Sequence, residues 1–448
     1  MSFFDIYPQK FYLLSAHNKR LMEFASPNHE LEQAVEDAFS NINRIEGGNI
    51  YSVYQYNADT LRVMTELSDT YKLRYPNVQQ LPSYFKDFQE GDYFIRHQSW
   101  APMIDLKRSM VKLDALTNGR DARRDDDIFV LNWGKLYLMF DAYSFGFLTD
   151  TIKVGEPDPE KRICRFCGKS GKDRFKDESH AIQEALGNKR LICHEECDEC
   201  NNLFSNTVET QLYKLLEINR TLSNVSGKGK KGHNLEGLNF HIHPDPITNT
   251  PVVYVKQNQV FNDVYRGNVT GKIHLYNNGK ISYQGVYKAL LKIAIDMIPS
   301  DKINHFVQTG HWVHGDFEAP VLPYFSYGEY HQFFEHPVLD LFFKTERSPQ
   351  DAPYCTAELR IFDSIFLFTI PFNDVDGNNY LNADEIRNHM NRFKQFEYLY
   401  VQEWEDLDAN DTTLQTPFYK LSFFQQDAPY RIEFRPESDD VFLIKRDK

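Results

Sequence analysis

The sequence predicts a multidomain α+β protein in which a small metal-binding module separates two larger regions. The chain has 448 residues, and at roughly 100–200 residues per domain this length corresponds to two to four domains. A hydrophobic content of 41%, with 15% aromatic residues, is enough to build real cores and argues against a disordered chain. Five of the six cysteines fall between residues 164 and 200, which marks the central module.

The N-terminal region, residues 1–157, is expected to be mixed and mostly helical, and the sequence assigns it no role. Asn28 precedes apolar residues at helical spacing, which is typical of a capped helix. Asn57–Tyr71 repeats this pattern and predicts a second helix. Two prolines among charged residues at 155–162 stop regular structure and predict the boundary of the region.

The C-terminal region, residues 233–448, is expected to be a β-rich α+β region with a regulatory or assembly role. Residues 272–283 predict a β-hairpin, because Asn278-Gly279 supplies the positive φ angles of a tight turn. Residues 287–298 predict an amphipathic helix that ends before Pro299. The apolar run 361–370 predicts a buried strand.

The cysteines of the central module, residues 158–232, form two Cys-x-x-Cys knuckles. Cys164 and Cys167 make the first, and Cys197 and Cys200 make the second, 29 residues further on. Disulfides are uncommon in large intracellular proteins, and four thiolates complete a tetrahedral structural zinc site. We therefore predict structural Zn²⁺ on these four cysteines. Cys193 or His194 is the alternative for one of the ligands.

The charge of the chain restricts where nucleic acid could bind. The net charge is −14, so phosphates are repelled by most of the surface. Residues 158–232 differ, because they hold 14 Lys and Arg against 12 Asp and Glu. Lys228, Lys230 and Lys231 close this module. They either contact backbone phosphates or form a solvated linker, and the sequence leaves both readings open.

The order of residues between and after the knuckles resembles a known family. After the first knuckle come His180-Ala-Ile, then Leu186-Gly-Asn188, and then the second knuckle followed directly by Asn201. This order is similar to that of HNH endonucleases with a double Cys-x-x-Cys zinc site. A weaker likeness continues through Tyr287-Lys-Ala-Leu-Leu-Lys. The resemblance implies that residues 158–232 form a ββα-metal (HNH) module of a His-Asn-Asn type.

The resemblance also implies roles for particular residues. His180 would be the general base that activates water, and Asn201 would bind a catalytic Mg²⁺ or Mn²⁺ ion. Asn188 would orient the loop through backbone hydrogen bonds. Capping of a helix is the alternative for Asn201.

The sequence departs from the family pattern at two positions. Ser179 stands where many members have an acidic metal ligand, so Glu178 or Glu209 would have to compensate. Gln183 replaces the usual proline. Glu209 is expected two helical turns beyond Asn201, and its alternative reading is a solvated helical side chain.

The predicted function is metal-dependent hydrolysis of phosphodiester bonds in nucleic acid. The resemblance alone favours DNA as the substrate and defence against phage as the setting. One alternative is a zinc-organised DNA-binding or partner-recruiting subunit without catalysis, which Ser179 favours. A second is an interaction scaffold, because acidic flanking regions suit a protein partner or a second copy of the chain.

The sequence offers no signal for a membrane or for secretion. No apolar run approaches the ~20 residues that span a bilayer. The N-terminus lacks the basic and apolar segments of a secretory signal. We therefore expect a cytoplasmic protein without a membrane partner.

Overall fold

The structure is a computed structural model, and the part of it described below covers most of the chain. The described residues are 10–15, 21–47, 51–98, 103–123, 136, 139–146, 151–225, 234–245, 251–256, 261–265, 268–319, 321–376, 383–394, 401–424, 430–434 and 440–445.

The chain divides into two compact units, Met1–Met139 and Phe140–Lys448. Both contain helices and sheets, so the multidomain α+β prediction is confirmed. The division falls earlier than the boundary expected near residue 157. Residues 158–225 also share one hydrophobic core with residues 281–409, so the cysteine module is part of the second unit rather than a separate body.

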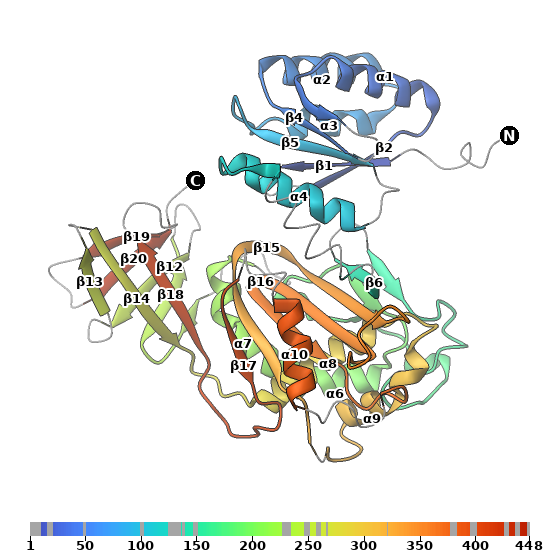
Figure 1. Cartoon of the computed structure of the whole chain (residues 1–448), viewed down its shortest axis with the longest axis vertical. Helices are drawn as coiled ribbons and strands as arrows, with labels where there is room; N and C mark the ends of the chain where they lie inside the picture. The colour runs from blue at the N-terminus through green and yellow to red at the C-terminus, as the bar shows by residue number, and fades with distance from the viewer. Residues whose placement is uncertain are drawn as a thin grey trace. The chain divides into compact units, whose positions relative to one another are not determined.

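The first unit is a five-stranded antiparallel sheet covered by helices. Its strands lie in the order β2-β1-β5-β4-β3. They are β1 (Lys10–Ser15), β2 (Leu21–Ala25), β3 (Arg44–Gly47), β4 (Tyr51–Gln55) and β5 (Tyr93–Gln98). The helices are α1 (His29–Ser40), α2 (Ala58–Tyr71), α3 (Gln80–Tyr84) and α4 (Met103–Thr117), with a 3-10 turn η2 (Pro76–Gln79). α1 and α2 cover one face and α4 covers the other (Figure 1).

The two helices predicted for the first unit are confirmed, together with the residues that begin them. The Asn28 side chain accepts a hydrogen bond from Leu31 N at the start of α1. Asn57 does the same for Thr60 N at the start of α2, and Thr60 reciprocates in a capping box. Each cap satisfies a backbone N–H group that the helix itself leaves unpaired.

The second unit is centred on a long antiparallel hairpin, β15 (Phe325–Lys344) and β16 (Cys355–Thr369). β15 also pairs with β17 (Val401–Leu407) and β6 (Phe140–Phe145). α10 (Ala383–Lys394) lies across one face of this sheet, and α7 (Val208–Leu222) and α8 (Tyr283–Met297) lie behind it (Figure 1). β16 is buried at almost every position because helices cover both faces of the sheet, which confirms the buried strand predicted at 361–370.

Three further sheets complete the second unit. One has the order β10-β11-β12-β20-β19, the next β13-β14-β18, and the third β7-β9-β8. Their strands are β7 (Ile152–Val154), β8 (Ser179–His180), β9 (Leu191–Cys193), β10 (Leu235–Glu236), β11 (Phe240–Pro244), β12 (Pro251–Lys256), β13 (Phe261–Tyr265), β14 (Asn268–Tyr276), β18 (Phe418–Phe424), β19 (Tyr430–Phe434) and β20 (Asp440–Lys445). The remaining helices are α6 (Asp198–Asn206) and α9 (Val307–His314), with 3-10 turns η3 (Lys172–Arg174), η4 (Glu184–Leu186) and η6 (Ile303–Phe306).

The hairpin predicted at residues 272–283 is wrong. β14 ends at Tyr276 and pairs with β13 and β18 instead. The residues after Asn278-Gly279 lead into α8, which Ser282 caps through Gly285 N. The helix predicted at 287–298 is confirmed, although it begins four residues earlier, at Tyr283.

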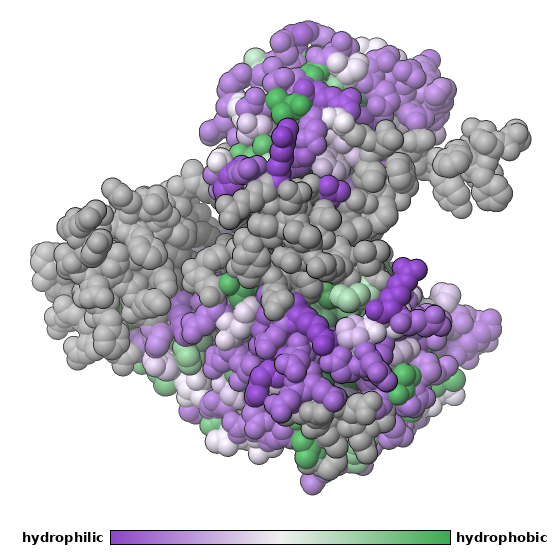
Figure 2. Space-filling model, viewed as in Figure 1, coloured by the Kyte–Doolittle hydropathy of each residue, from purple (hydrophilic) through white to green (hydrophobic). Residues whose placement is uncertain are grey.

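The surface of the described residues is mainly hydrophilic. Figure 2 shows hydrophilic side chains over most of the coloured area in view, with small and scattered hydrophobic patches. Across the described residues, no helix combines the length and the apolar composition that a membrane crossing requires.

Gly310 in α9 provides a test of how tightly the cysteine module packs into the second unit. A Cβ atom on Gly310 would lie 2.3 Å from the carbonyl oxygen of Arg165 in the first knuckle. We expect Gly310→Ala to lower the free energy of unfolding by about 1–3 kcal/mol, because backbone atoms cannot move aside easily. Urea unfolding followed by circular dichroism measures the change.

Gly285→Ala is the matched control for this prediction. The added methyl group there meets the flexible side chain of Gln211, so the expected loss is under about 1 kcal/mol. Equal stabilities of the Gly310→Ala variant and the wild type would contradict the packing described for α9.

Candidate functional site

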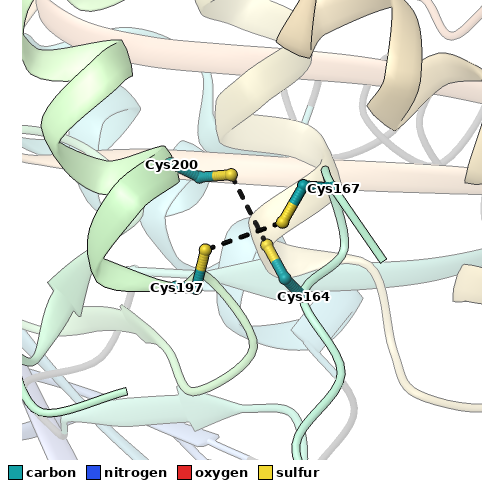
Figure 3. Close-up of side chains that lie close together, drawn as sticks. All are labelled: Cys164, Cys167, Cys197 and Cys200. Carbon is teal, nitrogen blue, oxygen red and sulfur yellow. Dashed lines mark hydrogen bonds between the residues drawn. The ribbon is translucent and has the colours of Figure 1, made fainter. Parts of the chain in front are cut away.

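The four knuckle cysteines converge on one point. The sulfur atoms of Cys164, Cys167, Cys197 and Cys200 all lie within 4.8 Å of one another. The Sγ atoms of Cys164 and Cys200 are 3.7 Å apart, and those of Cys167 and Cys197 are also 3.7 Å apart. Figure 3 shows the four sulfur atoms facing one another, two from a loop and two from the start of α6. These four cysteines are thus positioned to hold a metal ion.

Local backbone geometry explains how each knuckle presents its sulfur atoms. In the first knuckle the chain turns back at Gly168, whose φ is +68°, and Gly168 N donates to the carbonyl of Cys164. A backbone conformation with positive φ at this point favours glycine, because glycine has no Cβ atom. In the second knuckle Cys197 is the N-cap of α6, so Cys200 follows one turn later on the same side of the helix. Phe166, in the first knuckle, packs edge to face against Phe204 of α6, with ring centroids 4.7 Å apart.

The four thiols lie close enough together to shift one another's pKa values. Hydrogen bonding with Cys197 raises the pKa of Cys164 to about 12. Hydrogen bonding with Cys164 holds the pKa of Cys197 well below its ordinary value. Protons are therefore shared unequally among sulfur atoms that are nearly all buried. A divalent cation would replace these protons, and four sulfur donors that converge on one point suit Zn²⁺.

Cys193 and His194, the alternative ligands, are engaged elsewhere. Cys193 is buried in β9. His194 Nδ1 lies 3.1 Å from a guanidinium nitrogen of Arg162. Neither residue belongs to the cysteine group that could hold a metal among the described residues.

His180 lies on the short strand β8, which pairs antiparallel with β9. Its Nε2 atom is 3.2 Å from Oε1 of Glu184, in the turn that follows. Its Nδ1 atom is buried and has no hydrogen-bond partner among the described residues. Buried ring nitrogens are usually satisfied, so an unpartnered one calls for an explanation, and a catalytic role is one of the known reasons.

Asn188 holds the loop between β8 and β9 through backbone hydrogen bonds alone. Its amide nitrogen donates to the carbonyls of Ile182 and Leu191, at 2.8 and 3.0 Å. Its side-chain oxygen accepts from the backbone N–H groups of Arg190 and Leu191. The side chain is buried and all its bonds are to backbone, so it orients the loop and is not available to a substrate.

Asn201 sits within the first turns of α6 and does not cap the helix. Its backbone N–H donates to the carbonyl of Cys197, which is itself the N-cap. The capping alternative for Asn201 is therefore wrong. Its side chain is partly exposed, one residue beyond the last cysteine.

Glu209 differs from both readings of its sequence position. α6 ends at Asn206, and the chain bends at Thr207 before α7 begins, so Asn201 and Glu209 are not on one continuous helix. Glu209 is buried rather than solvated. Its carboxylate lies 2.8 Å from Lys292 Nζ and accepts a hydrogen bond of 2.9 Å from Gln183 Nε2.

Ser179 and Glu178, which were considered together with the missing acidic ligand, are also engaged in contacts. Ser179 is buried, and its hydroxyl donates to the carboxylate of Glu196. Glu178 is exposed and forms an ion pair of 2.5 Å with Lys153.

A buried charge cluster lies directly beneath β8, and we call Lys292, Glu196, Glu209 and Asp296 the Lys292 cluster. Lys292 Nζ lies 3.0 Å from Glu196, 2.8 Å from Glu209 and 2.9 Å from Asp296. Burial raises the pKa values of both Glu196 and Asp296, and the Asp296 carboxylate raises that of Glu196 further. Burial alone would lower the pKa of Lys292, but the three carboxylates outweigh it and raise the pKa.

Sequence reasoning missed Glu184 and most of the Lys292 cluster. Glu184 was detectable as a carboxylate four residues after His180. Lys292 and Asp296 were detectable as the two charged residues in the otherwise apolar run 289–298. Charged residues one helical turn apart on a buried face are expected to pair.

The basic residues Lys228, Lys230 and Lys231 lie outside the described residues. No protein-family model matches the chain, and comparisons with curated proteins and with solved structures find no match either. The HNH resemblance therefore stays a prediction that rests on the residues named above.

We expect about one zinc ion per chain by elemental analysis, because four thiolates complete one tetrahedral site. Cys200→Ser removes one thiolate from the four and is expected to abolish stoichiometric zinc. Cys193→Ser is the matched control, because it changes a buried cysteine in the same module and is expected to keep the zinc. Zinc lost from the control but kept in Cys200→Ser would show that the ligands are wrongly assigned.

Proposed function

We propose that this protein is a metal-dependent endonuclease of the HNH type, which hydrolyses phosphodiester bonds with His180 as general base. On the resemblance alone we further propose DNA rather than RNA as the substrate and defence against phage as the setting.

The observation that carries the proposal is the environment of the His180 ring. The carboxylate of Glu184 lies 3.2 Å from Nε2 and favours the tautomer with its proton on that nitrogen. The lone pair is then on Nδ1, which has no partner among the described residues. An imidazole with one anchored nitrogen and one nitrogen without a partner is suited to accept a proton from water.

The surrounding elements support the same proposal. The first knuckle is followed by the antiparallel strands β8 and β9 and then by α6, which gives the order β-β-α. Asn188 orients the connecting loop by backbone bonds, as the resemblance implies for the middle asparagine. The four cysteines hold the start of this segment against its end.

The proposed catalytic cation has one suitable donor among the residues considered for it. The carboxamide oxygen of Asn201 is a hard donor of the kind that Mg²⁺ and Mn²⁺ prefer. Glu178, Glu209 and Ser179 are engaged with Lys153, Lys292 and Glu196, so none of them completes the donor set as it stands. When bound, such a cation would stabilise charge on the phosphate oxygens.

A second candidate function is nucleic-acid or partner binding without catalysis. Two observations favour it. The position of the usual acidic ligand is taken by Ser179, which is buried against Glu196. The Nδ1 atom of His180 is itself buried, so a water molecule reaches it only if substrate binding moves the ring or its surroundings.

We expect His180→Ala to reduce cleavage of plasmid DNA by about 100- to 10,000-fold in the presence of Mg²⁺ or Mn²⁺, because a general base contributes a factor of this size. His194→Ala is the matched control, since His194 is in the same module but contacts Arg162, and it is expected to keep full activity.

Gel retardation by the same proteins separates the two candidate functions. Retardation by the wild type without cleavage would favour the binding function. Cleavage that survives in His180→Ala would remove His180 from the mechanism.

Glu184→Gln is expected to lower kcat about 10- to 100-fold with little change in KM, because partners that fix a reactive ring usually contribute a factor of this size. Glu160→Gln is a suitable control, since Glu160 is an exposed partner of Lys172. Cleavage kinetics over a range of DNA concentrations measure both constants, and an unchanged kcat would contradict the role given to Glu184.

A further inference from the structure

We propose that Lys292, a residue of α8 outside the cysteine module, is a positioning residue for His180. It would act by holding the backbone of the strand that carries the histidine. This inference rests on the proposed role of His180 and names the part of the protein that keeps it in place.

The ammonium group of Lys292 contacts the backbone on both sides of the His180–Ala181 peptide bond. Nζ donates to the carbonyl oxygen of His180 at 3.2 Å and lies 3.5 Å from that of Ala181. A charged donor forms stronger hydrogen bonds than a neutral one, and more so where water is excluded. Rotation of either peptide group would therefore break a charged contact in the core.

The carboxylates of the Lys292 cluster hold the side chains around the same peptide. Glu196 accepts from the hydroxyl of Ser179, just before His180. Glu209 accepts from Gln183 Nε2, three residues after it, at 2.9 Å. The segment 179–183 is thus held at four successive points by a single buried network. β8 itself has only two residues, so its own pairing with β9 supplies little restraint.

The composition of the cluster argues for a positional rather than a general stabilising role. Burying an ammonium with three carboxylates is costly, and hydrophobic residues of the same volume often stabilise a core as well or better. The side chains of Lys292, Glu196 and Asp296 are fully buried. The charged network fixes the direction of particular backbone and side-chain groups, which apolar packing does not do.

Glu196 also connects this network to the metal centre, because it directly precedes Cys197 in the chain. The strand that carries His180 is therefore held from two sides, by the cysteines in sequence and by α8 in space. The position of the His180 ring therefore depends on Lys292 and Asp296, which lie more than 90 residues beyond the second knuckle.

The test uses the full chain with zinc bound and compares Lys292→Met with the wild type by hydrogen–deuterium exchange and cleavage kinetics. We expect exchange to speed up at least tenfold in the peptide 178–184 but not elsewhere in the second unit. We expect kcat to fall about 100-fold, with KM changed less than about threefold. Zinc content is expected to stay the same.

Lys288→Met is the matched control. Lys288 lies one turn earlier on α8 and its ammonium faces the ring of Trp312 at 4.7 Å. We expect neither exchange in 178–184 nor cleavage to change in this variant.

Several outcomes would overturn the proposal. Exchange that rises uniformly across the second unit, with zinc lost, would make Lys292 a stability residue only. Unchanged exchange and unchanged kcat would also overturn it. If Lys292→Met does not fold, the double variant Lys292→Met/Asp296→Leu is used, which replaces the ion pair within α8 by apolar side chains. If the amides of 178–184 keep their protection from exchange in this double variant, the proposal is contradicted.

The wild type alone provides a further criterion. Ala181 N donates to the carbonyl of Leu191 at 3.0 Å. If the strand is held in place as proposed, the hydrogen of this amide exchanges as slowly as the amide hydrogens of α8. Exchange at loop rates would overturn the proposal without any variant. If the wild type cleaves no DNA, the proposed function fails, and the exchange measurements alone decide whether Lys292 holds the strand.

Discussion

The meeting of four sulfur atoms is the constraint on which the arrangement of the central module depends. The two knuckles are 29 residues apart in the chain, yet their four sulfur atoms lie within 4.8 Å of one another. The segment between them is therefore a closed loop, and closure removes much of the conformational freedom that a two-residue strand and a single 3-10 turn could not restrict by themselves. β8, η4 and β9 owe their definition to this closure and to Asn188.

Charged contacts restrict the orientation of β8, which closure of the loop between the knuckles does not. A loop held at its ends is still free to twist, and the twist of β8 decides where the imidazole of His180 points. The Lys292 cluster lies under that strand, and its residues come from two helices, α7 and α8, and from the segment that precedes α6. Its charges are costly to bury, and they lie beside a core built mainly of aliphatic and aromatic side chains.

Local signals in the sequence were sufficient for some features and misleading for others. The knuckle spacing indicated the metal centre, and the asparagine caps indicated α1 and α2, because each signal acts within four residues. Asn278-Gly279 suggested a hairpin, but β14 finds its partners 140 residues later and just before it, in β18 and β13. Glu209 was misread because a bend at Thr207 interrupts the helix. Lys292 could not be connected to His180 without long-range packing, since 111 residues separate them in the chain.

Arg165 has a consequence for how the metal centre and the distant helix depend on one another. It lies between the two cysteines of the first knuckle, and its guanidinium donates to the carbonyls of Ile295, Asp296 and Ile298 at the end of α8. These are the acceptors that a helix terminus leaves without partners of its own. Loss of the ion would loosen the knuckle and so withdraw a cationic cap from the very helix that bears Lys292. Metal binding at the knuckles would in this way affect a helix that the ion itself does not touch.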